Sequence, residues 1–213
     1  MNIINQILNF ETNNYSIIII AILIIIVLFI FTNKYKKKLG YVKSNIDGNY
    51  YLCRLRNDSL RAANTFAEIN RRLVYLVKYL KKNINNKKLN IKLNKYNSSF
   101  ISEAGAENKN TSYLVNKGES LVLCIRDKSN EYNLLDINTI MFVTLHEFAH
   151  LISDSIGHTD EFWSNFKFLL RKSSEISIYQ KVDYEKKNTP YCGISITNSP
   201  LFSDDIDIAN WKH

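Results

Sequence analysis

An unbroken apolar run is the first feature in the pattern of hydrophobic and polar positions along this chain. Residues 17–31 are all apolar, and their uncharged neighbours extend the run to about 18 residues. At 1.5 Å of rise per residue, a helix of that length measures roughly 27 Å, close to the thickness of a bilayer core. No lysine precedes the run, whereas lysines crowd residues 33–38 directly after it. This order favours an uncleaved transmembrane anchor over residues 15–32 rather than a signal peptide, whose positive charges come first.

The lysines after the run also predict an orientation, because positive residues stay on the cytosolic side of a membrane. We therefore expect a single-pass membrane protein with a short translocated N-terminus. The rest of the chain would face the cytosol or the interior of a virion. In this interpretation the N-terminal segment and anchor occupy residues 1–33, and a basic juxtamembrane linker occupies residues 34–48. A buried core helix is the alternative, but the run has no polar face.

From residue 49 onward, the pattern is that of one compact α+β domain, residues 49–213. Asn57-Asp58-Ser59 supplies helix-capping residues, and apolar positions then recur every three or four residues, which predicts an amphipathic helix over 59–82. Extended or alternating patterns predict three strands, at residues 89–93, 111–115 and 120–125. Together these segments predict a small mixed sheet. The strand 120–125 could bind an extended substrate as an added strand.

A second helix carries the informative residues. Asp136 is a capping residue, and the pattern after it predicts a helix from Thr139 to about Ser153. Gly157 permits a left-handed turn beyond that helix, and another helix then starts at residue 159 and ends near residue 172. The core side of this last helix is expected to hold its aromatic residues, Phe162, Trp163, Phe166 and Phe168.

The pattern His-Glu-x-x-His lies within the second helix, at residues 146–150. Two histidines four positions apart share a helix face, with Cβ atoms about 6 Å apart, which suits one zinc ion. Glu147 follows the first histidine and could take a proton from a metal-activated water as general base. The competing interpretations are two core histidines and a structural zinc site. Structural sites usually have four protein ligands and often thiolates, which this segment lacks.

A catalytic zinc needs a third protein ligand and one open coordination position. His158 is the candidate, because the predicted turn brings it back toward His146 and His150. Glu161 and Asp160, on the following helix, are the alternative ligands. A carboxylate in the turn, Asp154, is expected to support a ligand imidazole or simply to belong to the turn. Tyr184 and Tyr191 are candidates for oxyanion or substrate contacts, with ordinary half-buried packing as the alternative.

Composition and charge add two expectations. The three cysteines, Cys53, Cys124 and Cys192, are odd in number and far apart, which predicts free thiols that fill the core rather than disulfides. The net charge of +8 is uneven, because residues 33–95 carry 17 basic and 3 acidic side chains. Such a basic segment, residues 34–95, predicts contact with an anionic membrane surface. A solvated surface is the alternative, and contact with nucleic acid is a third option.

The motif and the residues after it resemble the WLM metallopeptidases and their SprT-like relatives. Residues 51–82, the segment ending at residue 128 and residues 182–201 are similar to a membrane-anchored branch of that family in large DNA viruses. The resemblance covers about residues 49–203. The residues that carry the resemblance are His146-Glu147-Phe148-Ala149-His150 and Gly157-His158-Thr159-Asp160-Glu161-Phe162-Trp163. The chain differs from the metzincins in one spacing, because seven residues separate its second and third histidines and metzincins have five there.

The resemblance implies a zincin-like metallopeptidase fold, in which the H-E-x-x-H helix packs on the small mixed sheet. It implies one Zn²⁺ per chain, held by His146, His150 and His158, with Glu147 as general base. The leading prediction is thus a membrane-anchored zinc-dependent metalloendopeptidase acting on a protein or peptide substrate. The first alternative is a DNA-associated protease of the crosslink-repair type. The second is a catalytically inactive, zinc-stabilised structural membrane or virion protein.

Overall fold

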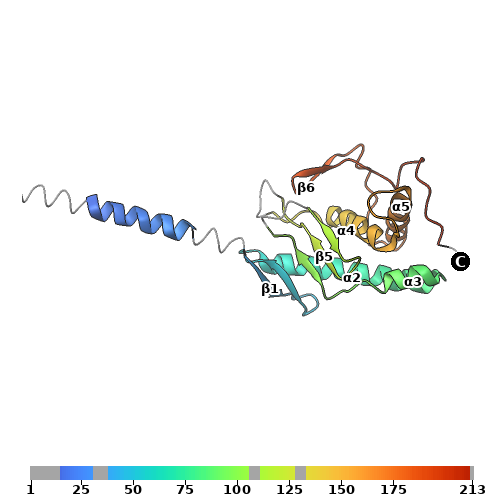
Figure 1. Ribbon diagram of the computed structural model, residues 1–213, viewed down its shortest axis with the longest axis horizontal. Helices are drawn as coiled ribbons and strands as arrows, with labels where there is room; N and C mark the ends of the chain where they lie inside the picture. The colour runs from blue at the N-terminus through green and yellow to red at the C-terminus, as the bar shows by residue number, and fades with distance from the viewer. Residues whose placement is uncertain (1–14, 31–37, 106–110, 128–132, 212–213) are drawn as a thin grey trace, which may run out of the picture. The chain divides into compact units, whose positions relative to one another are not determined.

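The computed structural model describes residues 15–30, 38–105, 111–127 and 133–211, and the chain divides into two compact units after Lys38 (Figure 1). In the first unit, residues 15–30 form a helix. Within the described ranges, no helix is both long enough and apolar enough to cross a membrane. The predicted anchor and the single-pass membrane localisation are therefore wrong.

The second unit begins at Leu39 and contains all the elements discussed below. Residues 34–37 of the predicted linker lie outside the described residues, and part of its remainder forms the first strand rather than a linker. In chain order the elements are β1 (Leu39–Lys43), β2 (Tyr50–Arg54), α2 (Ser59–Asn83), α3 (Lys87–Leu93), β3 (Ile101–Glu103), β4 (Tyr113–Val115), β5 (Ser120–Leu123), α4 (Ile137–Ile152), α5 (Asp160–Glu175), β6 (Thr189–Tyr191) and β7 (Ile194–Ile196).

The main sheet has five strands in the order β1-β2-β3-β5-β4. β3 pairs parallel with both β2 and β5, whereas β1 and β4 pair antiparallel with their neighbours, so the mixed sheet and the α+β class are confirmed. β5 lies between two strands, and its backbone groups are used on both sides. The predicted addition of a substrate strand to residues 120–125 is therefore wrong, because the edge strands of this sheet are β1 and β4.

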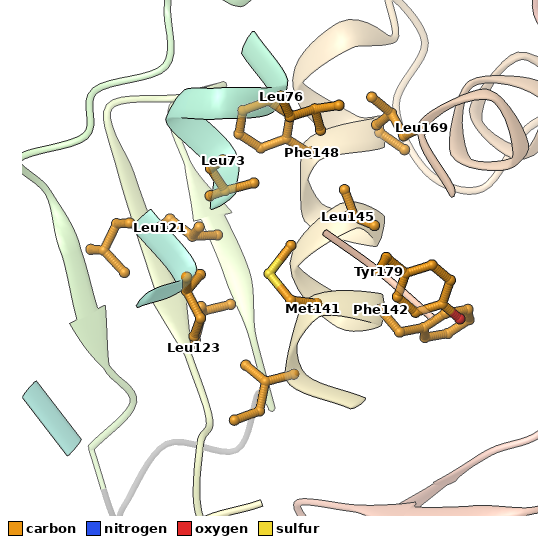
Figure 2. Packing of buried hydrophobic residues seen from close by; sticks show 14 of the residues in the cluster. Leu73, Leu76, Leu121, Leu123, Met141, Phe142, Leu145, Phe148, Leu169 and Tyr179 are labelled. Carbon is orange, nitrogen blue, oxygen red and sulfur yellow. The ribbon is translucent and has the colours of Figure 1, made fainter. Parts of the chain in front are cut away.

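Two helices pack on this sheet and on each other. α2 contacts β1, β2 and β3, α4 contacts β4 and β5, and α5 packs against α4. Figure 2 shows Leu73 of α2, Leu121 of β5 and Met141 of α4 in the shared core. All three side chains are buried, and each such burial stabilises the fold by about 1.5–3 kcal/mol. The helices predicted at 59–82 and from residues 139 and 159 are thus confirmed with shifted ends.

One predicted strand is wrong, because residues 89–93 belong to helix α3. The Asn86 side chain caps this helix by accepting the Leu89 N–H at 2.9 Å. Leu89 and Leu93, four residues apart, are buried, whereas Ile91 between them is 54% exposed. The alternation of apolar and polar residues therefore reflects a single helical turn with one exposed isoleucine.

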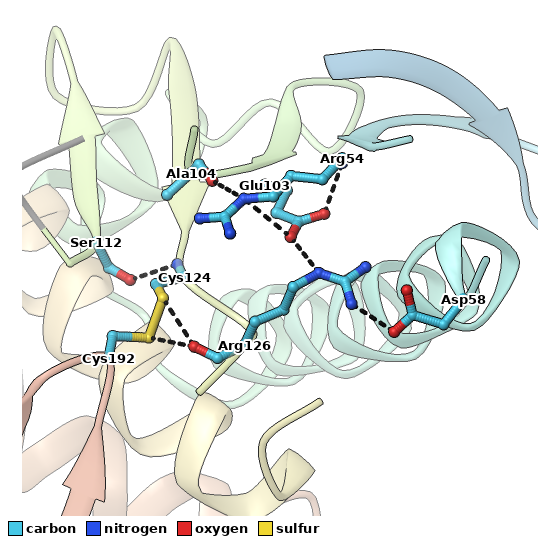
Figure 3. A network of polar contacts seen from close by, with 8 residues as sticks. All are labelled: Arg54, Asp58, Glu103, Ala104, Ser112, Cys124, Arg126 and Cys192. Atoms are coloured by element: carbon cyan, nitrogen blue, oxygen red, sulfur yellow. Dashed lines mark hydrogen bonds and ion pairs between the residues drawn. A yellow bond between two sulfur atoms is a disulfide. The ribbon is translucent and has the colours of Figure 1, made fainter. Parts of the chain in front are cut away.

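A buried charge network ties the sheet to the start of α2 (Figure 3). The fully buried Arg126 guanidinium donates to Glu103 Oε1 at 2.6 Å and also pairs with Asp58. The other oxygen of Glu103 accepts the Arg54 backbone N–H at 2.8 Å. Asp58 occupies the predicted N-cap position of α2, but its carboxylate serves the arginine rather than a backbone N–H. Removing one partner from a buried pair of this kind typically costs about 3–5 kcal/mol.

The prediction of three free cysteines is wrong in part. Cys124, just after β5, and Cys192 form a disulfide, whereas Cys53 is a free, buried thiol as predicted. Cys192 and Gly193 form the two-residue turn of the β6–β7 hairpin, both with positive φ, at 52° and 86°. This turn brings the sulfur atoms together across 68 residues of sequence. The fold, and not the spacing along the chain, decides the pairing.

Candidate metal centre

Helix α4 holds the two histidines and the glutamate of the H-E-x-x-H motif. Its start is fixed by the predicted cap, since the Asp136 carboxylate accepts the N–H groups of Asn138 and Thr139 at 2.9 and 3.0 Å. The His146 and His150 rings follow on one face, with centroids 5.1 Å apart. A helix with this start and this buried face presents both imidazoles at one end of the core.

The chain reverses after α4 through a turn that several polar groups hold. Gly157 adopts the predicted left-handed conformation, with φ at 83°. The Glu161 carboxylate, in the first turn of α5, accepts the backbone N–H groups of Asp154 and Ser155 at 2.8 and 2.9 Å. The Thr159 side chain caps α5 by accepting a hydrogen bond from the backbone N–H of Phe162, in the first turn of the helix. These bonds set the position of the residue between the turn and α5, which is His158.

The three imidazoles converge. His158 Nε2 lies 3.0 Å from His146 Nε2, and one ligand atom from each of His146, His150 and His158 lies within 4.8 Å of the others. With Zn–N bonds of about 2.0–2.1 Å, the nitrogens of a tetrahedral site are roughly 3.4 Å apart. Among the described residues, these three histidines form the group of potential metal ligands whose ligand atoms lie close enough together to share one ion. The donor set therefore fits a zinc ion.

One aromatic ring backs all three histidines. The centroid of the fully buried Phe162 ring lies 4.8, 4.3 and 4.6 Å from the centroids of His146, His150 and His158. Phe166 adds a second contact behind His146, at 5.3 Å. The prediction that the aromatic residues of α5 form its core side is confirmed. Their packing leaves the imidazoles few alternative orientations.

Burial keeps the two helix histidines neutral. Burial, together with the neighbouring imidazoles, lowers the pKa of His146 to about 3. Burial likewise lowers the pKa of His150 to about 4, with help from His158 and from the positive charge of Lys117. Neutral imidazole is the form that binds a metal. His158 is the exposed member of the three, so solvent reaches the group from its side.

Glu147 lies behind the histidines, against the edge strand β4. Its side chain is 7% exposed, and burial raises the pKa of its carboxyl group to about 7. A hydrogen bond from the Leu114 N–H acts in the opposite direction on that pKa. The sequence alone does not predict this contact between Leu114 and Glu147, because the contact depends on the register of β4.

The three turn carboxylates differ in their contacts. Glu161 is occupied by the two backbone N–H groups of the turn. Asp154 forms ion pairs with Lys88 and Lys92, and its backbone carbonyl accepts from Lys117, so its contacts are those of a turn residue. Asp160 is exposed in the first turn of α5. Within the described residues, none of the three joins the cluster of converging ligand atoms.

The two candidate tyrosines are buried, and the charge of Glu147 is among the causes that raise the pKa of Tyr191. Tyr184 is buried and packs on Phe142, one helical turn before the first histidine, with ring centroids 4.6 Å apart. Tyr191 is fully buried, and its hydroxyl donates to the Cys124 carbonyl at 2.7 Å and contacts Ser112 Oγ at the same distance. The predicted oxyanion or substrate role of both residues stays a prediction.

Lys117 is a residue near the histidines that the sequence did not single out. It lies in the turn between β4 and β5, and its ammonium donates to the Asp154 carbonyl at 3.0 Å. Its charge is among the causes that lower the pKa of His150. The signal was present in Asn116-Lys117-Gly118, a turn sequence between two extended segments. The other predicted contacts of the basic segment, with anionic surfaces or nucleic acid, stay predictions.

Sequence comparison finds relatives for most of the chain. A profile of the WLM domain matches residues 78–201, a stretch that includes all three histidines. Protein R325 of Acanthamoeba polyphaga mimivirus is 36% identical over 199 residues, which cover 89% of this chain and 99% of R325. Protein 136R of Invertebrate iridescent virus 6 is 38% identical over 97 residues, 45% of this chain and 53% of 136R. The sequence thus has relatives in two large DNA viruses.

Two solved structures are also similar, both of Wss1 from Saccharomyces cerevisiae. A mutant of Wss1 superposes with a TM-score of 0.46 at 20% identity, over 58% of this chain and 86% of that one. Wss1 itself superposes with a TM-score of 0.44 at 21% identity, over 57% of this chain and 84% of that one.

Proposed function

This chain belongs to the WLM domain family, and from that membership and the facing imidazoles we propose that it is a zinc-dependent endopeptidase. The observation that carries the proposal is the approach of His158 Nε2 to His146 Nε2, at 3.0 Å, beside the third ring. Three imidazoles and one open position are the ligand set of a catalytic zinc, whereas structural sites are closed by a fourth protein ligand. Because His158 is exposed, solvent and substrate would reach an ion held by these residues from its side.

In this proposal the zinc ion would be held by His146, His150 and His158. When bound, it supplies a Lewis acid that polarises the scissile carbonyl and makes water acidic enough to attack near neutral pH. The Glu147 carboxylate accepts the proton of the attacking water and passes it to the leaving amine. Its burial supports this role, because removal from water raises the pKa of the carboxyl group and makes it a better proton acceptor than an exposed glutamate.

The edge strand β4 supports the substrate part of the proposal. β4 lies at an edge of the sheet, and its Leu114 N–H reaches Glu147. An extended peptide could pair with this edge through main-chain hydrogen bonds, which depend little on side chains. A substrate held in that way would lie with its backbone beside the general base.

The test separates catalysis from metal binding. In the zinc-loaded full chain, Glu147→Gln should lower cleavage of denatured casein by about 10²–10⁴-fold, because the general base is lost. Its zinc content, measured by plasma emission spectrometry, should stay at that of the wild type. A wild-type chain that holds zinc and cleaves nothing would favour the structural role instead.

The ligand set is tested separately by a matched pair of substitutions. His158→Ala should lose most of its bound zinc, because two ligands remain. Glu161→Gln should keep its zinc, because the Glu161 carboxylate serves the backbone of the turn. The opposite result would make Glu161 the third ligand. Removing the metal with a chelator should abolish the cleavage activity of the wild type, and added Zn²⁺ should restore it.

A further inference from the structure

We propose that Lys117 makes the chain prefer substrates with an acidic residue on the N-terminal side of the cleaved bond. The inference rests on the proposed endopeptidase function and adds a substrate class to it. Lys117 bridges two segments that border the histidines, because it extends from the β4–β5 turn to the Asp154 carbonyl, in the loop between α4 and α5. Its ammonium thus lies across one end of the space between the edge strand and the His158 turn.

The turn that carries Lys117 is fixed against the end of α4. Asn116 and Lys117 both have positive φ, at 45° and 51°, and Gly118 follows at 118°. A Cβ atom at Gly118 would lie 2.7 Å from Leu151 Cδ1 and 2.8 Å from the Lys95 carbonyl oxygen. The turn therefore rests on the residue that directly follows His150. The backbone of this turn thus has a defined position relative to the histidines, and the exposed Lys117 side chain extends from it.

Within the described residues, Lys117 is a positive charge without a carboxylate partner. The carboxylates around it are engaged elsewhere: Asp154 by Lys88 and Lys92, Glu161 by backbone N–H groups, and Glu119 by the Asn116 side chain. Among the described residues, the ammonium of Lys117 contacts a neutral carbonyl oxygen and no carboxylate. An ammonium has three donors, so two remain for a ligand. A carboxylate is the partner that satisfies both its charge and these donors.

The direction of β4 sets the side of the substrate that meets Lys117. The strand runs from Tyr113 to Val115 and then into the turn, and Glu147 reaches its middle at Leu114. A peptide paired antiparallel with β4 runs the other way, so its N-terminal part leaves the strand toward Lys117. At about 3.3 Å per residue, the ammonium faces a position roughly two to four residues before the cleaved bond.

A peptide library tests the preference. The zinc-loaded full chain is incubated with random-sequence decapeptides, and the cleavage positions are read by mass spectrometry. For the wild type, Asp and Glu should be enriched about 2- to 5-fold in the window two to four residues before the cut, the size of an exposed ion pair. Lys117→Gln should remove the enrichment, and Lys117→Glu should replace it with enrichment of Lys and Arg.

Two controls separate specificity from folding. Lys87→Gln removes an exposed charge at the start of α3 without changing the ion pairs of Asp154 or the β4–β5 turn, so the acidic preference should persist. Zinc content should match the wild type in every variant. Raising the salt from about 0.05 M to about 0.5 M should weaken the wild-type preference, because exposed charges are screened. A purely structural role of Lys117 predicts no such salt dependence.

The outcomes distinguish this inference from the function on which it rests. Cleavage by the wild type with no acidic preference, or with the same preference in Lys117→Glu, overturns the role of Lys117 and leaves the endopeptidase intact. Acidic enrichment on the C-terminal side of the cut overturns the antiparallel placement and the inference with it. A wild-type chain that cleaves no peptide overturns both.

Discussion

The ring of Phe162 contacts all three imidazoles of the candidate metal centre. Metal ligands in proteins are usually oriented by hydrogen bonds from neighbouring groups. In this site much of the orientation comes from an aromatic ring within packing distance of each imidazole. We therefore expect the proposed metal affinity to depend on a side chain that cannot itself bind metal.

A pair of substitutions on α5 tests this role of Phe162. Phe162→Leu and Phe168→Leu both shorten a buried aromatic side chain, so each should lower the free energy of unfolding by about 1–2 kcal/mol. Only Phe162→Leu should also weaken zinc binding, by about 10-fold, because the imidazoles gain alternative orientations. Urea unfolding and competition with a chromophoric chelator measure the two quantities. Equal zinc affinity in the two variants would show that the ring is core packing alone.

Among the elements, short turns determine where the functional groups lie. The β4–β5 turn holds Lys117, and its Gly118 fits against Leu151 and the Lys95 carbonyl with no room for a side chain. Gly48 also has positive φ, at 73°, but a Cβ there would meet nothing within 4 Å. Gly118 therefore combines a clash with a φ of 118°, far from the left-handed helical region, whereas Gly48 has the cost of its backbone conformation alone.

Substituting these two glycines gives a prediction about the turn. Gly48→Ala should cost about 1 kcal/mol of unfolding free energy, the price of a left-handed conformation for a residue with Cβ. Gly118→Ala should cost roughly 1–3 kcal/mol more, because its Cβ would collide with a backbone oxygen and a buried leucine. Urea denaturation of both variants checks the difference. Similar costs would mean that the turn moves freely away from α4.

The sequence predicted those elements whose local signals agree. α4 has a capping aspartate, Asp136, and a helical apolar pattern, and both signals give the same start. Residues 89–93 fit both a strand and a helix. The spacing of four residues between Leu89 and Leu93 equals two periods of a strand and about one turn of a helix. The capping role of Asn86, upstream of them, was the signal in favour of a helix. Short apolar runs of this kind cannot be assigned from periodicity alone.

The candidate metal centre was largely predictable for a different reason. Its ligands come from one helix and the turn after it, so the spacing from His146 to His158 contains most of the geometry. Contacts from distant segments were not predictable in this way. The hydrogen bond of Leu114 to Glu147 depends on the register of β4, and the Lys117 contact depends on how a turn packs against α4.

For the second unit as a whole, stability depends on how the segment after α5 is fastened. The Lys167 ammonium donates to the carbonyl groups of Ser203 and Ile206, and the Trp211 indole donates to Asn165, so the tail is attached to α5. The disulfide attaches the β6–β7 hairpin to the end of β5. These attachments hold a segment with little regular structure of its own against the sheet and α5.

Removing the disulfide therefore gives a prediction for the whole unit. The cross-link closes a loop across 68 residues, and the loss of that constraint on the unfolded chain should cost about 4 kcal/mol. A chain with both Cys124→Ala and Cys192→Ala should unfold at a lower urea concentration than the wild type, and a strong reductant should bring the wild type close to it. Cys53→Ala, which alters a buried free thiol, controls for lost packing and should keep its response to reductant.

Zinc binding in the same variants separates the hairpin from the metal centre. The three histidines are positioned by α4, its following turn and the Phe162 ring, none of which the disulfide joins. Zinc affinity of the folded double variant should thus remain within a few-fold of the wild type, even though its unfolding free energy falls. If the affinity fell together with the stability, the hairpin would be part of the framework of the metal centre. That result would also strengthen the case for a role of Tyr191, the residue beside Cys192.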